Sequence, residues 1–344
     1  MPPTDSGAAP TISGLGPASP EHWDAALEAS PHATFFHSRS WAEIWQAASR
    51  NRLRPEPVRV RFSDGASAVV PICFDTRSGF RVSSPAGSYG GWLCEAPLGK
   101  PHADALARHL LRQYPAFSWR LNPFNELERA SAPASAREEH TRVLELAPGI
   151  DSLRRGFSKG HRAAIGQARR LGVEAAPARG DEAWAAYARL YASSLSRWGA
   201  RASVRHDARL FQELAQREGD RVRLWLARHG EEVVAGAIVL RSGEHAAYWH
   251  GAARGDRFHL RPVHLLLHEA IEHACHEGLE IFDFNPSGGL AGVEAFKKGF
   301  GARPLPCPVV AYERLPWWKS LRVKLGGLRA KLEGQHGARV GLPR

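Results

Sequence analysis

An acidic residue and a glycine-rich loop come together at the end of a short apolar segment late in the chain. Ile281–Phe284 is predicted to be a strand, and its Asp283 precedes the loop Asn-Pro-Ser-Gly-Gly. A carboxylate placed there can orient an attacking amine or take its proton, and a capping or turn-forming Asp is the alternative. Glycines let the backbone approach a ligand, and exposed N–H groups hold anions. Ser287 and Gly288 are therefore candidate substrate-binding residues.

Basic residues gather on one predicted amphipathic helix, Ser152–Leu171, whose apolar stripe contains Phe157 and Ile165. Its Arg162 is a candidate ligand for a phosphate or diphosphate, because a guanidinium binds phosphate through a bidentate fork. The alternative is that this helix presents an ordinary solvated basic face.

A strand after the middle of the chain carries two further candidates. Tyr248 and His250 are two residues apart, and strand periodicity places them on one face, where they could line a substrate groove. A histidine packed in the core is the alternative for His250.

The motifs of several other chemistries are absent from the sequence. The four cysteines form no C-x-x-C pair, so we expect no metal site. No phosphate-binding P-loop and no serine nucleophile elbow occurs, which disfavours a covalent serine enzyme.

The elements that must position these residues form two units of mixed helices and strands. Helices are not regularly interleaved with parallel strands, so the pattern predicts the α+β class. We expect two domains joined by a polar linker rich in Ala, Ser and Pro, with a flexible segment before them and a basic tail after them. The predicted limits are 1–20 for the leader, 21–128 for the N-terminal domain, 129–140 for the linker, 141–314 for the C-terminal domain and 315–344 for the tail.

Three blocks of the sequence resemble one known family. Residues 262–302 resemble the end of the catalytic domain of Fem-type aminoacyltransferases and of the related Gcn5-like N-acyltransferases (GNAT proteins). The matching pieces are Gly278, Phe282-Asp283-Phe284, the small-residue loop at Ser287–Gly289, and Phe296-Lys297-Lys298-Gly299-Phe300-Gly301. Upstream, KGHRAAIGQARRLGV resembles a helix of the family, and FFHSRSWAEIW resembles its opening. The likeness covers residues 32–313, and its C-terminal block is the specific part.

This resemblance implies tandem GNAT-like (acyl-CoA N-acyltransferase) domains, each a mixed, mainly antiparallel sheet flanked by helices. It also implies that Lys297 is the catalytic lysine, because that residue matches the lysine after Phe in the family pattern. An ammonium beside a developing oxyanion stabilises it by several kcal/mol in a dry site. Phe296, the preceding residue, is then a substrate contact. Lys298 points to another helix face and serves as the internal control.

The sequence also departs from the family. It has no long charged helical hairpin, and no lysine follows Trp41, where cell-wall Fem enzymes carry a ligand for a substrate phosphate. The coenzyme A loop of single-domain acetyltransferases is replaced by GDRFHLRP. Neither the acceptor nor the donor of the family therefore transfers directly to this chain.

Charge is concentrated at the C-terminal end. Residues 314–344 hold eight Lys or Arg against one acid, so they contribute +7 to a net charge of +11, and coating of nucleic acid by the whole protein is disfavoured. Residues 317–332 combine two tryptophans, a leucine stripe and basic residues, which is typical of a helix on an anionic membrane surface. The alternative is a helix docked on the body. We expect no signal peptide and no membrane span, hence a cytoplasmic protein, peripheral on the inner face of the plasma membrane if the tail binds there.

The sequence therefore predicts an N-acyltransferase that moves an acyl or aminoacyl group to an amino group. The acceptor would be a small-molecule or lipid-linked precursor of peptidoglycan or exopolysaccharide. No bound cofactor is expected; the donor is acyl-CoA or aminoacyl-tRNA, and tRNA is a partner in the second case. Two alternatives are a non-catalytic protein of the membrane surface and an RNA-binding protein, each retaining the fold.

Overall fold

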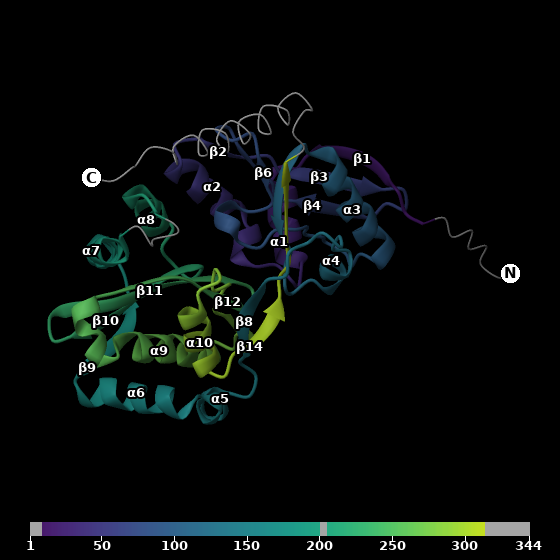
Figure 1. The fold of residues 1–344 in the computed structure, drawn as a ribbon. Coiled ribbons are helices and arrows are strands. Elements are labelled where there is room, and N and C mark those ends of the chain that lie inside the picture. Colours follow the sequence, from purple (N-terminus) through teal and green to yellow (C-terminus); the bar gives the residue numbers. More distant parts are fainter. Residues whose placement is uncertain (1–8, 200–204, 314–344) are drawn as a thin grey trace, which may run out of the picture.

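The computed structural model describes residues 9–199 and 205–313, which form two α+β halves packed against each other (Figure 1). One core is shared between the halves: the rings of Phe35 and Trp41 from the first pack with those of Tyr187 and Phe211 from the second. The predicted tail at 315–344 lies outside the described residues.

The N-terminal half contains two small sheets. Their strand orders are β1-β3-β4 and β15-β7-β6-β5-β2. The strands are β1 (Ile12–Pro17), β2 (Leu53–Pro55), β3 (Val58–Phe62), β4 (Ser67–Val70), β5 (Cys73–Asp75), β6 (Arg81–Val82), β7 (Ala116–Arg120) and β15 (Val309–Glu313). The helices are α1 (Pro20–Ala29), η1 (Phe35–His37), α2 (Arg39–Ala48), η2 (Pro85–Gly87), α3 (Lys100–Gln113) and α4 (Glu126–Ala130).

The C-terminal half is built on one seven-stranded sheet of order β14-β8-β13-β12-β11-β10-β9. Its strands are β8 (His140–Glu145), β9 (Val173–Ala178), β10 (Val222–His229), β11 (Glu232–Ser242), β12 (His245–Ala253), β13 (Ile281–Asp283) and β14 (Arg303–Pro306). The helices are α5 (Ile150–Gly156), α6 (Lys159–Arg170), α7 (Asp181–Trp198), α8 (Ala208–Ala215), η4 (Gly255–Leu260), α9 (Pro262–His276) and α10 (Ala291–Gly299).

The two halves repeat one arrangement of strands. In the first, β5 pairs antiparallel with β6, β6 pairs parallel with β7, and α3 connects the parallel pair. In the second, β11 pairs antiparallel with β12, β12 pairs parallel with β13, and α9 makes the connection. This repeat confirms the predicted α+β class with mixed, mainly antiparallel sheets flanked by helices.

Three local predictions are wrong. The leader predicted at 1–20 includes a strand, since Ile12–Pro17 pairs with β3 through backbone hydrogen bonds. The Gly and Pro content of this segment is typical of a loop, and for that reason the sequence did not predict the strand. The single helix predicted at 152–171 is two helices, since the Ser158 hydroxyl accepts from the His161 N–H and starts α6 anew. Strand β15, expected in the C-terminal domain, pairs with β7 of the N-terminal sheet.

The parallel pair β12 and β13 separates early, and this opening positions the candidate site. Three residues of each strand are paired, from His245 with Ile281 to Ala247 with Asp283. Beyond them β12 continues to Ala253, while the chain after β13 turns away at Asn285, which has a φ of 58°. Helix α10 then brings Lys297 back to the point of separation, where it bonds to the Asn285 carbonyl oxygen.

Candidate functional site

Lys297 lies in the last turn of α10 and is only 4% exposed. Its Nζ donates a 2.6 Å hydrogen bond to the carbonyl oxygen of Asn285, at the turn where β13 ends. Burial lowers the pKa of this amine to about 8, although the negative charges of Asp283 and Glu294 oppose the shift. At pH 7 the amine is therefore mostly protonated, in a largely dry site. Lys298 is exposed, as expected for the neighbouring helix face.

Asp283 ends β13 and is fully buried. Its neighbours Phe282 and Phe284 face the core beneath α9, so strand alternation turns Asp283 toward the N-terminal half. Oδ1 accepts hydrogen bonds from the Thr141 hydroxyl at 2.6 Å and from the Asn285 N–H at 2.8 Å. Asp283 and Lys297 thus lie in one buried centre, and their catalytic roles stay predictions.

The loop after β13 forms one wall of a cleft of about 500 Å³ whose other wall is the segment 137–140. Ser287 and Gly288 line this cleft. The Ser287 hydroxyl donates to Glu294 at 2.8 Å, and Glu294 also pairs with Arg142 and His140. Although burial opposes the shift, these hydrogen bonds lower the pKa of Glu294 to about 2. A charged network centred on Glu294 therefore lines this cleft, on the same helix that carries Lys297.

Phe296 belongs to a cluster of rings on the opposite side of α10. Its ring centroid lies 5.2 Å from that of His161 on α6 and 5.0 Å from that of His264 on α9. Nε2 of His161 is 2.9 Å from the Phe296 carbonyl oxygen. Burial lowers the pKa of both histidines, that of His264 to about 4, so the cluster is uncharged at neutral pH. Phe296 is half-buried and anchors α10 to its neighbours.

Arg162 does not join Lys297 in the described structure. Its guanidinium donates to the carbonyl oxygens of Arg155 and Phe157, at the end of α5. The side chain therefore caps the C-terminal end of one helix from the first turn of the next. Its predicted role as a phosphate ligand stays a prediction, and binding a phosphate would require this cap to open.

The prediction that Tyr248 and His250 share a face is wrong. Tyr248 pairs with Val239 and His250 with the adjacent Ile238, because Trp249 is an extra residue that forms a β-bulge. Tyr248 packs on the core below α9, whereas His250 contacts Tyr187 on the other face, ring to ring and through its Nδ1. The Tyr248 carbonyl oxygen does reach the opening, where it accepts from the Asn285 side chain at 2.9 Å.

The sequence missed three residues around Asp283. Besides Thr141, these are Tyr89 from the N-terminal half and His245 at the start of β12; Tyr89 is fully buried and His245 is 7% exposed. Nε2 of His245 lies 3.4 Å from Oδ2 of Asp283, too far and poorly aligned for a hydrogen bond. Tyr89 lies in the loop SPAGSYGG, whose 194-residue separation from Asp283 gave no signal.

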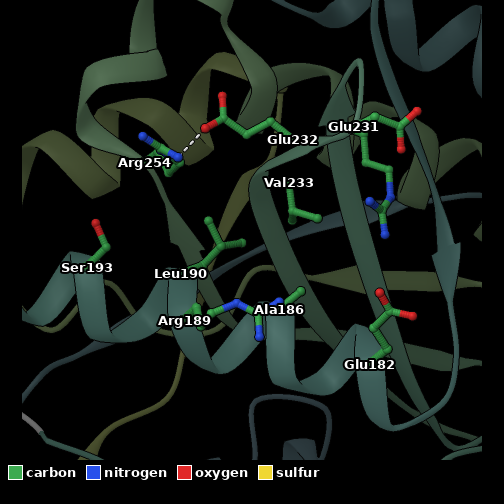
Figure 2. A pocket seen from close by; sticks show the side chains of 10 residues that line it. Glu182, Ala186, Arg189, Leu190, Ser193, Glu231, Glu232, Val233 and Arg254 are labelled. Atoms are coloured by element: carbon green, nitrogen blue, oxygen red, sulfur yellow. Dashed lines mark hydrogen bonds and ion pairs between the residues drawn. The ribbon is translucent and has the colours of Figure 1, made fainter.

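Other clusters and cavities lie apart from this centre. A cavity of about 360 Å³ between α7 and the β10–β11 hairpin is lined by charged groups, and there Arg254 is already paired with Glu232 (Figure 2). His268, Glu269 and Glu272 could hold a metal ion, but the guanidinium of Arg169 lies 2.8 Å from Glu269 and supplies the positive charge. Within the described residues no helix is long and apolar enough to cross a membrane.

Comparisons with known proteins agree with this fold. Residues 152–298 match the family model described as "Acetyltransferase (GNAT) domain". The structure of FemX is similar, with a TM-score of 0.63 at 15% identity over 89% of this chain and 99% of that one. A search of curated proteins finds no significant match.

Two further similar structures carry another name. The C-terminal domain of a putative lysylphosphatidylglycerol synthetase from Agrobacterium fabrum has a TM-score of 0.54 at 11% identity, over 82% of this chain and 95% of that one. L-PGS from Bacillus licheniformis has a TM-score of 0.53 at 13% identity, over 87% and 93%. Together with the repeated halves, these matches confirm a fold of tandem GNAT-like halves that is similar to the fold of FemX.

Proposed function

We propose that the protein is an N-acyltransferase that moves an acyl or aminoacyl group from a thioester or ester donor to an amino group. The observation that carries this proposal is the buried ammonium of Lys297, held where β12 and β13 separate inside the segment that matches the GNAT domain. Transfer to an amine passes through a tetrahedral oxyanion, which a fixed positive charge in a dry site stabilises.

Lys297, Asp283 and the neighbouring cleft each have a separate role in the proposed reaction. The Lys297 ammonium has three N–H donors, and its bond to Asn285 uses one, so two remain for the oxyanion. The acceptor amine must lose a proton, which Asp283 or the substrate itself takes. The cleft lined by Ser287 and Gly288 is the proposed place of the acceptor.

The N-terminus of α9 bears on the identity of the donor. The segment 255–262 replaces a coenzyme A loop, and helix α9 begins with Pro262, which has no N–H. The His264 N–H is bonded to the Arg261 carbonyl oxygen. Few N–H groups therefore remain to bind a diphosphate, which supports aminoacyl-tRNA over acyl-coenzyme A. Exposed Arg155, Lys159 and Arg170 on α5 and α6 offer charge for a nucleic-acid donor.

The first experiment measures donor binding and turnover by the purified full chain. Coenzyme A thioesters are compared with charged and uncharged tRNA. The acceptors include amine-bearing cell-envelope precursors and, as a hydroxyl acceptor, phosphatidylglycerol in vesicles. Phosphatidylglycerol is included because lysylphosphatidylglycerol synthetases are among the similar structures. Replacing Lys297 by Ala should lower kcat about 100-fold or more while donor binding persists. Lys298→Ala should change neither quantity.

The rival proposals give different results. A non-catalytic protein that retains the fold would show no turnover with any donor and no difference between the two lysine variants. An RNA-binding protein would bind charged and uncharged tRNA equally, with a steep loss of affinity as salt rises. Deleting residues 315–344 separates binding by the predicted membrane-surface segment 317–332 from binding by the body.

A further inference from the structure

The carboxylate of Asp283 is surrounded by buried polar atoms that lack partners. Within the described residues, Oδ2 of Asp283, the hydroxyl oxygen of Tyr89 and both ring nitrogens of His245 are buried and form no hydrogen bond. Most buried polar groups in proteins are hydrogen-bonded, so four unpartnered atoms around one side chain require a reason. Only Oδ1, bonded to Thr141 and Asn285, is satisfied in this structure.

Tyr89 and His245 can both act as donors to the Asp283 carboxylate. Burial and the negative charge of Asp283 raise the pKa of Tyr89 well above its usual range, so its phenol keeps the proton that it can donate. Nε2 of His245, 3.4 Å from Oδ2, is near enough to close a hydrogen bond after a shift of a few tenths of an ångström. The Phe124 ring packs against both rings, with centroids 6.2 Å from Tyr89 and 4.8 Å from His245.

The conformation of the loop that carries Tyr89 allows this side chain to reach the C-terminal half. A Cβ at Gly90 would overlap the side chain of Ser83, and a Cβ at Gly91 would overlap the buried carboxylate of Glu128. Gly91 also has a φ of 118°, which side chains other than glycine rarely adopt. These two glycines bring the loop close enough to its own half for Tyr89 to reach into the other.

We propose that Tyr89 and His245 are positioning residues for the Lys297 centre, because both face the Asp283 carboxylate, whose Oδ1 is already fixed by Thr141 and Asn285. The N-terminal half then completes the centre of the C-terminal half. The proposal relies on the proposed function only in treating Lys297 as the reactive group. It is tested through the charge of Lys297, without any acyl substrate.

The test is a titration of Lys297 in the full chain. The sequence contains seven lysines, so labelling lysine with ¹³C at Cε gives seven NMR signals, and Lys297→Ala identifies the one required. A donor hydrogen directed at the Asp283 carboxylate offsets part of its negative charge, so removing the donor strengthens the negative field at Lys297. Tyr89→Phe and His245→Phe should each raise the Lys297 pKa by about half a unit, roughly a threefold change in proton affinity.

Controls separate positioning from general damage. Asp283→Asn removes the negative charge itself and should lower the Lys297 pKa, and His245→Gln, whose amide can donate in place of the ring, should keep the wild-type value. Tyr312→Phe removes a hydroxyl that donates to the Leu111 carbonyl oxygen at 2.8 Å, and it should leave Lys297 unchanged. If Lys297 keeps or lowers its pKa in Tyr89→Phe and His245→Phe while Asp283→Asn lowers it, the proposal is overturned. Failure to bind any donor would instead count against the proposed function alone.

Discussion

Burying a charged lysine lowers the stability of a folded protein, and Lys297 is buried without a close carboxylate partner. Its only hydrogen bond among the described residues is to a backbone carbonyl, and Asp283 and Glu294 act on it through space. An aliphatic side chain of similar length would fill the same volume without desolvating a charge. Retaining the ammonium therefore favours a chemical role over a structural one.

Replacing Lys297 by Met should stabilise the protein at pH 7, by about 1–3 kcal/mol. The folded pKa of about 8 lies below the usual value of 10.5, so the unfolded chain binds more protons between these values. Stability of the wild type should therefore rise from pH 8 to pH 10.5, and the advantage of Met should shrink over the same range.

Urea unfolding of both proteins at several pH values measures this difference. Lys298→Met is the matched control, because that side chain is exposed and should show no such pH dependence. A loss of stability at pH 7 in Lys297→Met would mean that the amine is a structural donor to Asn285.

At the scale of elements, regular apolar spacing in the sequence predicted strand positions correctly. It did not predict the β-bulge, in which one extra residue changes the face on which side chains lie. The strand 281–284 was predicted to within one residue, because its apolar spacing is a local signal. The bulge at Trp249 has no such signal, and it placed Tyr248 and His250 on opposite faces. Lys297 and Asp283 were found through the family resemblance and the Gly-rich loop. Tyr89, Thr141 and His245 depend on packing between the halves, which no local pattern encodes.

The contact between α10 and α6 depends on one glycine. A Cβ at Gly299 would overlap the ring of His161, whereas a Cβ at Gly292 in the same helix meets nothing within 4 Å. Gly299→Ala should push α6 away from α10 and destabilise the protein by about 1–3 kcal/mol. Gly292→Ala should be neutral or stabilising by up to about 1 kcal/mol, because alanine favours helix.

Thermal unfolding of the two glycine variants tests this difference. Equal midpoints would show that His161 can swing aside without cost. In that case the ring cluster of His161, His264 and Phe296 would not fix the position of Lys297.

On the scale of the whole molecule, the two halves are joined by a strand pairing and by a common apolar core. Strand β15 follows the C-terminal half in sequence and completes the sheet of the N-terminal half beside β7. Val310 of this strand is 3% exposed within the N-terminal core. The shared core around Trp41 and Tyr187 adds apolar contact between the halves. We therefore expect one cooperative unfolding transition for both halves.

Val310→Ala should destabilise both halves together, by about 1–2 kcal/mol, because it leaves a cavity in the N-terminal core while β15 ties that core to the rest of the chain. Fluorescence of the 11 tryptophans and far-UV circular dichroism should report the same shifted midpoint. Val309→Ala, at a half-buried position, should shift it less. Two separated transitions would show that the halves unfold independently.

The return of β15 also sets an order for synthesis of the protein. Residues 12–120 hold every other strand of the N-terminal sheets, yet the partner of β7 is made only when residues 309–313 leave the ribosome. Until then β7 is an unpaired edge with an apolar side, which is the kind of surface that aggregates or recruits chaperones. The N-terminal half, although synthesised first, can therefore complete its sheet only after β15 has been synthesised. A chain stalled before residue 309 should be a target for quality control.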